Sequence, residues 1–283
     1  MNQALTLTTF DAPQRRLDPR LDVKEPDEGW TWPPTSVTLI SGEKHAILVD
    51  TLPTVVDSTA LADWIESSGR DLTTIYITHG HLDHYLGAAA LLERFPGARL
   101  VATEATARHI AREVESGTER AMYSTMFVDA LVATIAVPEL LRDDHIELEG
   151  HEVLAVATGQ SDHTDSSYVH VPELAAVVVG DIAYNDVHPA LMGSDHATRQ
   201  RWIDTLRDVQ ALHPRIVVAA HRRPDAPNDA RALSDTIAYL EEADRALAAN
   251  STAAGFVEQM LASGPVRLNA STLMFGAAAL GLR

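Results

Sequence analysis

The stretch Thr78–His84 reads THGHLDH and directly follows the apolar run IYI of residues 75–77. A turn after a strand can bring three histidines and an aspartate into one small volume, and Gly80 allows the backbone a tight path there. Imidazole and carboxylate groups are the usual ligands of zinc and of other first-row divalent metals. The stretch therefore predicts a metal site at the end of a strand, and a chance surface cluster is the alternative.

Three other apolar runs, each predicted as a strand, lead to a side chain of the same kind. His163 follows the first run after a short polar segment, Asp181 ends the second and His221 ends the third. If any one of these residues is considered alone, the simplest interpretation is a capping or core residue. Sites in open α/β sheets gather at strand ends, so together with the first motif these residues predict one site built from four strand ends.

Short runs rich in Val and Ile alternate with helical patterns after residue 37, which indicates a layered α/β fold. The first 36 residues contain five prolines and show no periodicity, so we expect an extended arm that Trp30 and Trp32 attach to the body. Residues 104–145 are predicted as a mostly helical insertion, with one helix over about 117–141. The expected organisation is an arm over 1–36, a catalytic domain over 37–223 that contains this insertion, and a helical C-terminal extension over 224–283 packed on the same domain.

The composition narrows the function. The 283 residues include 40 acidic and 22 basic ones, which gives a net charge of -18. This balance argues against nonspecific nucleic-acid binding and against docking on anionic membranes. The chain has no cysteine, so thiolate metal ligands are excluded. No signal-peptide pattern or membrane-spanning run is found. We expect a cytoplasmic protein that acts on a small molecule. The sequence leaves open whether it forms a homodimer.

The quoted residues resemble the metallo-β-lactamase superfamily, whose pattern is His-x-His-x-Asp-His followed by a His, an Asp and a His after later strands. The match covers about residues 37–222, and Asp50 corresponds to an early Asp that supports the ligand loop. The resemblance implies a four-layer αββα sandwich. The ligands that it implies are His79, His81 and His163 for one metal and Asp83, His84 and His221 for the other, with Asp181 bridging both.

A site of this kind has a general chemistry. Two divalent ions about 3.5–4 Å apart can share a water and lower its pKa toward about 7, and the hydroxide attacks a carbonyl or phosphoryl centre. The expected cofactors are two divalent ions, with Zn²⁺ favoured and Mn²⁺ or Fe²⁺ as alternatives. Asp83 is expected to orient the nucleophile. The implied ligands would leave the metal pair net positive, which favours anionic or polar substrates.

The residues at and after Asp181 narrow the substrate. An aspartate bridge is similar to those of glyoxalase II-like thioesterases, phosphodiesterases and quorum-quenching lactonases. Tyr184, three residues later, resembles a tyrosine of the lactonases and is expected to donate a hydrogen bond to the carbonyl oxygen as it gains charge; packing is the alternative. His188 lies on the same loop as a candidate substrate contact. Met122, Met126 and Phe127 in the insertion are candidates for a pocket roof that suits acyl chains, with helix packing as the alternative.

We therefore expect a dinuclear zinc hydrolase that uses a metal-bridged hydroxide to cleave a small ester-type substrate, such as a lactone. A thioesterase of the glyoxalase II kind and an amide or β-lactam hydrolase are the alternatives among hydrolases. A mononuclear iron dioxygenase of the same fold and a non-catalytic binding protein are less favoured, because neither requires the complete ligand set that this sequence carries.

Overall fold

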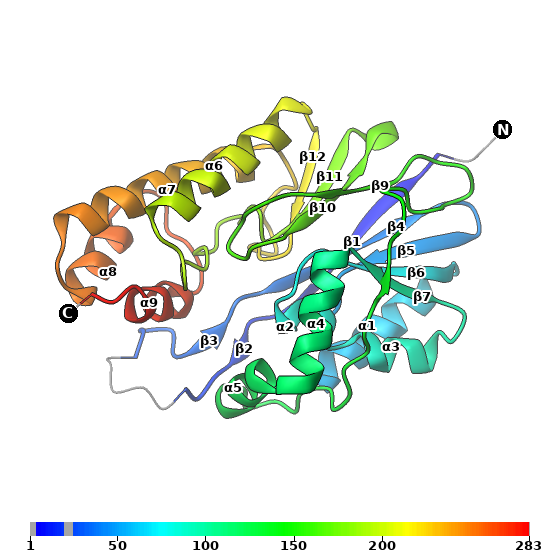
Figure 1. The fold of residues 1–283 in the computed structure, drawn as a ribbon, viewed down its shortest axis with the longest axis horizontal. Coiled ribbons are helices and arrows are strands. Elements are labelled where there is room, and N and C mark those ends of the chain that lie inside the picture. The colour runs from blue at the N-terminus through cyan, green and yellow to red at the C-terminus, as the bar shows by residue number, and fades with distance from the viewer. Residues whose placement is uncertain (1–3, 20–24, 283) are drawn as a thin grey trace.

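Two β-sheets lie face to face, and helices cover the outer face of each sheet (Figure 1). The structure is a computed structural model that describes residues 4–19 and 25–282. It confirms the predicted four-layer αββα sandwich. The first sheet has the order β1 (Thr6–Ala12), β4 (Thr35–Ser41), β5 (His45–Val49), β6 (Asp71–Ile77), β7 (Arg99–Ala102), β8 (Glu139–Leu140). The second has the order β12 (Ile216–Ala219), β11 (Ala176–Gly180), β10 (Ser167–Val171), β9 (Leu154–Ala157), and β2 (Arg15–Arg16) pairs separately with β3 (Thr31–Trp32).

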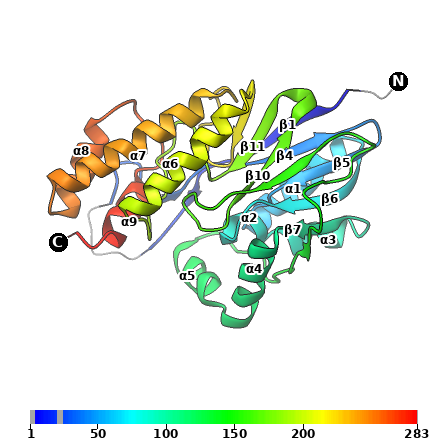
Figure 2. The same cartoon turned by 45° about the horizontal axis from the view of Figure 1, so that its top comes forward.

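The helices fall into two outer layers and one flank (Figure 2). The layer on the first sheet contains α1 and α3, and the layer on the second sheet contains α6 and α7, while α4 and α5 lie beside the sandwich. The helices are α1 (Val55–Ser67), α2 (Leu82–Tyr85), α3 (Ala88–Arg94), α4 (Glu104–Ser116), α5 (Thr118–Met126), α6 (His196–Ala211), α7 (Arg231–Ala249), α8 (Ala253–Ala262) and α9 (Ala270–Ala279). Asp195 caps α6 through a capping box.

Apolar side chains between the layers hold the sandwich together. Ile40 and Ile47 of the first sheet belong to the same buried cluster as Val169 and Val178 of the second. These strands are buried on both faces, which explains why they appear in the sequence as continuous runs of Val and Ile rather than as alternating patterns. Trp202 on α6 belongs to a separate buried cluster over the outer face of the second sheet.

The N-terminal segment differs from the extended arm that we expect from the sequence. Residues 6–12 form β1, which pairs antiparallel with β4 over its whole length, from Thr6 opposite Ser41 to Ala12 opposite Thr35. The prolines lie outside this strand and interrupt only the residues after it. The attachment by tryptophan is confirmed for Trp30, which is buried and stacks on Phe275 of α9 with ring centroids 5.2 Å apart.

The predicted helix over 117–141 is wrong beyond residue 126. α5 ends at Met126, and the chain then runs along the start of α1. There the backbone amide of Val55 donates to Ala130 at 2.9 Å, and that of Val132 donates to the carbonyl oxygen of Pro53 at 2.9 Å. These long-range bonds replace the helical ones. No helix in the described part of the chain is long and apolar enough to cross a membrane.

Candidate metal centre

The motif Thr78–His84 leaves β6 and enters α2, a helix of only four residues. Its path is fixed by Asp50, at the end of the neighbouring strand β5. The carboxylate of Asp50 accepts hydrogen bonds from the backbone amide and hydroxyl of Thr78, both at 2.8 Å, and lies 3.1 Å from Nδ1 of His84. The supporting role expected for Asp50 is therefore confirmed. A second constraint comes from Gly180, which has a φ of +53° and where an added Cβ would lie 2.7 Å from Oγ1 of Thr78.

The first group of ligand-type atoms contains His79, His81, Asp162 and Asp181, all within 4.8 Å of one another. Nε2 of His79 lies 3.1 Å from Nδ1 of His81. The same Nδ1 lies 3.2 Å from Oδ2 of Asp162. Two imidazoles and two carboxylates thus converge on one small volume, which is a donor set that divalent zinc, iron or manganese accepts.

The second group contains Asp83, His84 and His221, whose atoms also lie within 4.8 Å of one another. Oδ2 of Asp83 is 3.5 Å from Nε2 of His84 and 3.3 Å from Nε2 of His221. Asp181 lies between the two groups. Its oxygens are 3.4 Å from Nε2 of His84, 3.3 Å from Nε2 of His221 and 3.9 Å from Nε2 of His79.

His163 is the predicted ligand that the structure leaves outside both groups. Its Nδ1 is directed at the carbonyl oxygen of Thr164, and its ring packs edge-on against His81, with centroids 4.9 Å apart. Asp162, the preceding residue, is the one grouped with His79 and His81. The sequence signal for Asp162 was its place in the same loop, directly beside the histidine. Metal binding by His163 stays a prediction.

Burial and neighbouring charges shift the pKa values of the acids and bases of the site, and the direction differs from residue to residue. Burial, with the neighbouring charge of His84, places the pKa of His79 well below its ordinary value. Burial also disfavours the charged form of His84, but the carboxylates of Asp181 and Asp83 raise its pKa well above the ordinary value. Burial opposes ionisation of Asp83, yet His84 and His221 lower its pKa to about 2. The carboxylate of Asp83 is therefore charged at neutral pH.

Two buried atoms show that the residues fit metal ions. Nε2 of His84 and Oδ1 of Asp181 have no hydrogen-bond partner in the described structure, although they face each other at 3.4 Å. Buried polar atoms without partners are costly unless a ligand satisfies them. On the far side of its ring, His221 has Nδ1 3.2 Å from the carbonyl oxygen of Pro34, which leaves Nε2 free for a metal. The donor set and its orphan atoms fit divalent ions in both groups.

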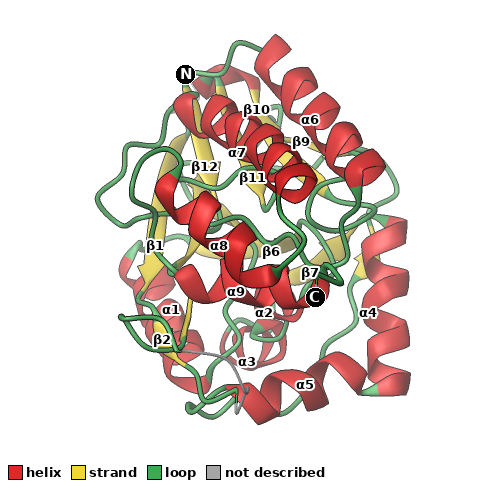
Figure 3. Ribbon diagram, turned by 90° about the vertical axis from the view of Figure 1, so that its left-hand side faces the viewer, coloured by secondary structure: helices red, strands yellow, loops and turns green. Residues whose placement is uncertain are grey.

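A cavity of about 290 Å³ opens beside the two groups. Its walls come from segments far apart in the chain, namely β3, α5, the loop before α6 and α9. In the view of Figure 3, α9 and α5 appear on either side of α2, the helix that carries Asp83 and His84. Of the side chains predicted to contact substrate, Met122 and Tyr184 line this cavity. Met126, Phe127 and His188 are not among the described residues that line it. Phe127 instead stacks on Tyr123, and Nδ1 of His188 lies 3.1 Å from the hydroxyl of Tyr239.

Two aromatic residues hold Asp83, and the sequence assigned this role to neither of them. Nε1 of Trp32 donates to Oδ2 of Asp83 at 3.3 Å, and the hydroxyl of Tyr123 donates to Oδ1 at 3.2 Å. The rings of Trp32 and Tyr123 pack on each other with centroids 5.0 Å apart. The N-terminal segment and α5 therefore meet over the second ligand group and fix the orientation of its carboxylate.

Tyr184 lies on the loop after β11, at the border between the ligand groups and the cavity. Its hydroxyl is 3.0 Å from Oδ2 of Asp162 and 3.0 Å from Oδ2 of Asp181. Because a phenol carries one proton, it donates to one of these carboxylates at a time. Burial, together with the charges of Asp162 and Asp181, raises the pKa of Tyr184 well above its ordinary value. The hydroxyl therefore keeps its proton and remains a donor.

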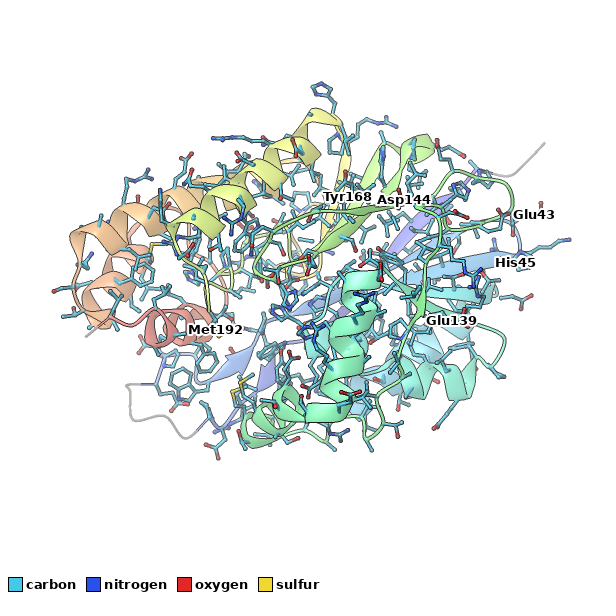
Figure 4. All side chains as sticks on the ribbon, viewed as in Figure 1. Glu43, His45, Glu139, Asp144, Tyr168 and Met192 are labelled. Carbon is cyan, nitrogen blue, oxygen red and sulfur yellow. The ribbon has the colours of Figure 1, made fainter. Side chains whose placement is uncertain are left out.

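Two other histidines lie away from the site. His45 pairs with Glu149 at 3.1 Å and lies near Glu43 at the β4–β5 hairpin, on the right in Figure 4, whereas Met192 of the cavity wall lies left of centre. His151 pairs with Glu173 at 2.7 Å. A third, His109, lies against the ligand loop, since an added Cβ on Gly80 would meet its ring.

The sandwich and its ligand groups define a class, the metal-dependent hydrolases built on an αββα fold. A family model described as the metallo-beta-lactamase superfamily matches residues 30–221. The chain belongs to this superfamily, whose members are mostly hydrolytic metalloenzymes. No curated protein sequence matches the chain.

Solved structures of low sequence identity share the fold. A metallo-beta-lactamase family protein from Thermus thermophilus matches with 17% identity and a TM-score of 0.65, over 97% of this chain and 92% of its own. A metallo-beta-lactamase from Pontibacter korlensis matches with 18% identity and a TM-score of 0.57, over 85% and 96%. The metallo-beta-lactamase FIM-1 from Pseudomonas aeruginosa, in a mono-zinc form, matches with 15% identity and a TM-score of 0.57, over 86% and 93%. At these identities the likeness shows the fold alone.

Proposed function

We propose that this protein is a dinuclear, zinc-dependent hydrolase that cleaves a small ester-type bond, with a lactone as the favoured substrate. The observation that carries the proposal is the position of Asp181 between the two ligand groups, at the edge of a cavity with largely apolar walls. Zinc is favoured by the donor set of imidazoles and carboxylates, and the related enzyme FIM-1 is described in a mono-zinc form.

Each residue has a separate part in this function. One ion would be held by His79, His81 and Asp162, with His163 as the alternative to Asp162. The other ion would be held by Asp83, His84 and His221. Asp181 would bind both ions. Two such ions supply an acidified water and polarise the substrate carbonyl.

Asp83 and Tyr184 would act directly on the reacting groups. Asp83 is held from both of its oxygens by Trp32 and Tyr123, so it can orient the water by accepting a hydrogen bond from it. Tyr184 can turn its hydroxyl from a ligand carboxylate to the carbonyl oxygen as that oxygen gains charge, which is the kind of donation that favours the transition state.

The complete second group favours hydrolysis over redox chemistry at a single iron. Asp83, His84 and His221 form a buried set that a mononuclear centre does not require. Within the hydrolases, a thioesterase shares the same attack on a carbonyl carbon and is the second candidate. The apolar cavity walls suit the acyl part of either substrate.

The proposal is tested by metal content and by a substrate screen. Protein purified without chelator should contain about two divalent ions per chain by elemental analysis. The zinc-loaded protein should then hydrolyse lactones or simple esters faster than thioesters, β-lactams or phosphodiesters. A reproducible content of one ion with full activity contradicts the dinuclear mechanism. Preference for any of the other three bonds, with two ions bound, contradicts the ester assignment but retains the hydrolase.

A further inference from the structure

Glu119 is an acidic side chain of the cavity wall that the metal groups do not use. It lies in the first turn of α5 and lines the cavity together with His81 and Asp83. Its Oε1 lies 2.8 Å from Nε2 of His109. Its Oε2 is buried and has no hydrogen-bond partner in the described part of the chain. A buried acceptor without a partner is costly. The carboxylate of Glu119 thus adds a negative charge to the cavity wall.

Glu119 is held in place at its backbone and at its carboxylate. Its backbone amide donates to Oε2 of Glu113 at 3.1 Å. Its partner His109 packs against the ligand loop so closely that an added Cβ on Gly80 would lie 2.6 Å from the imidazole ring. The ring of His109 also packs edge-on against His163, with centroids 4.8 Å apart. Glu119 is therefore a fixed charge beside the metal groups rather than a mobile surface group.

Among the described residues that line the cavity, none is a lysine or an arginine that could balance Glu119. The next residue along α5, Arg120, directs its guanidinium to the carbonyl oxygen of Ala133. Asp162, grouped with the first ligand set in place of His163, adds a further negative charge. The sequence-based expectation of a net positive metal pair that attracts anions is therefore weakened by these two carboxylates.

Most of the wall away from the ligand groups is apolar. It is formed largely by side chains of the N-terminal segment, α5, the loop before α6 and α9, among them Trp32, Met122, Met192 and Phe275. Trp32 and Phe275 supply flat apolar surface, and methionine side chains adapt to ligands of different shape. Such a wall accommodates a hydrocarbon chain but offers nothing to a carboxylate or a phosphate carried by that chain.

We propose that Glu119 determines specificity: it makes the cavity select esters whose acyl chain is uncharged or positively charged and reject those whose chain ends in a carboxylate or phosphate. This inference rests on the proposed function, because it describes the substrate of the same site. An ammonium on the chain would be attracted to the carboxylate of Glu119, and an anionic chain would meet a like charge in a site of low dielectric.

The test uses three esters that share one alcohol and one acyl length, with the acyl chain ending in a methyl group, an ammonium or a carboxylate. For the metal-loaded wild-type protein, kcat/KM for the carboxylate-ended ester should be at least about tenfold below that for the methyl-ended ester. Glu119→Gln, which keeps an acceptor for His109, should reduce this discrimination about tenfold. Glu115→Gln is the matched control, because Glu115 is exposed on the neighbouring helix α4 and the charge change is the same.

The outcomes separate the two proposals. If no ester of the series is hydrolysed, the proposed function is contradicted, and so is this inference, which rests on it. If esters are hydrolysed and the carboxylate-ended one is equal or preferred, the function stands and the specificity is overturned. An unchanged ratio in folded Glu119→Gln overturns the role of Glu119. If that variant does not fold, inhibition of the wild-type protein by hexylammonium and by hexanol decides, and tighter binding of hexylammonium supports the inference whereas equal or weaker binding overturns it.

Discussion

The floor and the roof of the cavity are built from different kinds of structure. The floor consists of His79, Asp83, His84, Asp181 and His221, which follow strand ends and are almost completely buried. The roof consists of side chains from β3, α5, the loop before α6 and α9, and its Met122 and Met192 are 51% and 41% exposed. Reaction chemistry requires ligands fixed to a fraction of an ångström, which a sheet provides. Substrate binding tolerates more variation in side-chain position, and it is provided by segments outside the two main sheets.

Removing a floor carboxylate should have the largest effect. Asp83→Ala should lower kcat by orders of magnitude and reduce the metal content to about one ion per chain, because the second group loses one of its three ligands while the first remains. Elemental analysis and turnover on the best ester are the measurements. Asp208→Ala, an exposed position on α6, serves as the control. Near-normal turnover of Asp83→Ala would show that the second group is dispensable.

Tyr184 at the border of floor and cavity should come next. Tyr184→Phe removes only the hydroxyl, and kcat and kcat/KM should fall together by about 10²–10³ because a donor to the developing oxyanion is lost. Tyr239→Phe removes another buried hydroxyl, at His188, and should leave turnover unchanged. If Tyr184→Phe has lower stability but wild-type kcat in the folded fraction, the tyrosine acts in packing.

A roof residue that touches the floor should have a smaller effect. Trp32→Phe removes the indole donor to Asp83 but keeps an aromatic ring against Tyr123. Loss of one outer partner of a metal ligand typically costs about 10–100-fold in activity or metal affinity, and we expect the lower end because Tyr123 still binds Asp83. Steady-state kinetics and zinc titration measure this. If kinetics and zinc affinity are both unchanged, Trp32 only lines the cavity and does not support Asp83.

His188 lies outside both regions and should affect stability rather than turnover. Burial, and to a lesser degree the charge of Arg267, lowers its pKa to about 3 from 6.5. The unfolded chain therefore binds a proton that the folded protein does not, and this residue makes stability fall as the pH drops from 6.5 toward 3. The slope contributed is at most about 1.4 kcal/mol per pH unit.

Urea unfolding at pH 7 and pH 5 measures the effect of His188. His188→Gln should show a smaller loss of stability between the two values than the wild-type protein. His145→Gln, at an exposed position, is the control. An equal loss in His188→Gln and wild type would contradict the buried neutral histidine.

The floor was accessible from the sequence because its residues follow strands directly. His79, Asp181 and His221 stand next to apolar runs, and the ends of neighbouring strands meet in space. The sequence could not show in this way which of Asp162 and His163 faces the metal site. They are adjacent in one loop, and which of two neighbours faces the site depends on backbone torsions that residue types do not specify.

The roof was not accessible in the same way. The contacts of Trp32 and Tyr123 with Asp83 span 51 and 40 residues of sequence, and nothing local to either aromatic residue indicates its partner. The strand at residues 6–12 was missed for a related reason, since its pairing partner β4 determines it and the prolines around it suggest a loop. In the insertion, helical periodicity was outweighed by backbone bonds to the start of α1.

The joining of the two ends of the chain over the cavity has a consequence for biosynthesis. The amide of Thr31 donates to Oγ of Ser271 at 3.0 Å across 240 residues, and Trp30 stacks on Phe275 close by. A ribosome releases the ligands of the floor well before it releases α9, because His221 is the last of them. A nascent chain can therefore assemble its metal ligands first and close the substrate wall only after α9 has emerged, so that selectivity follows the capacity to bind metal.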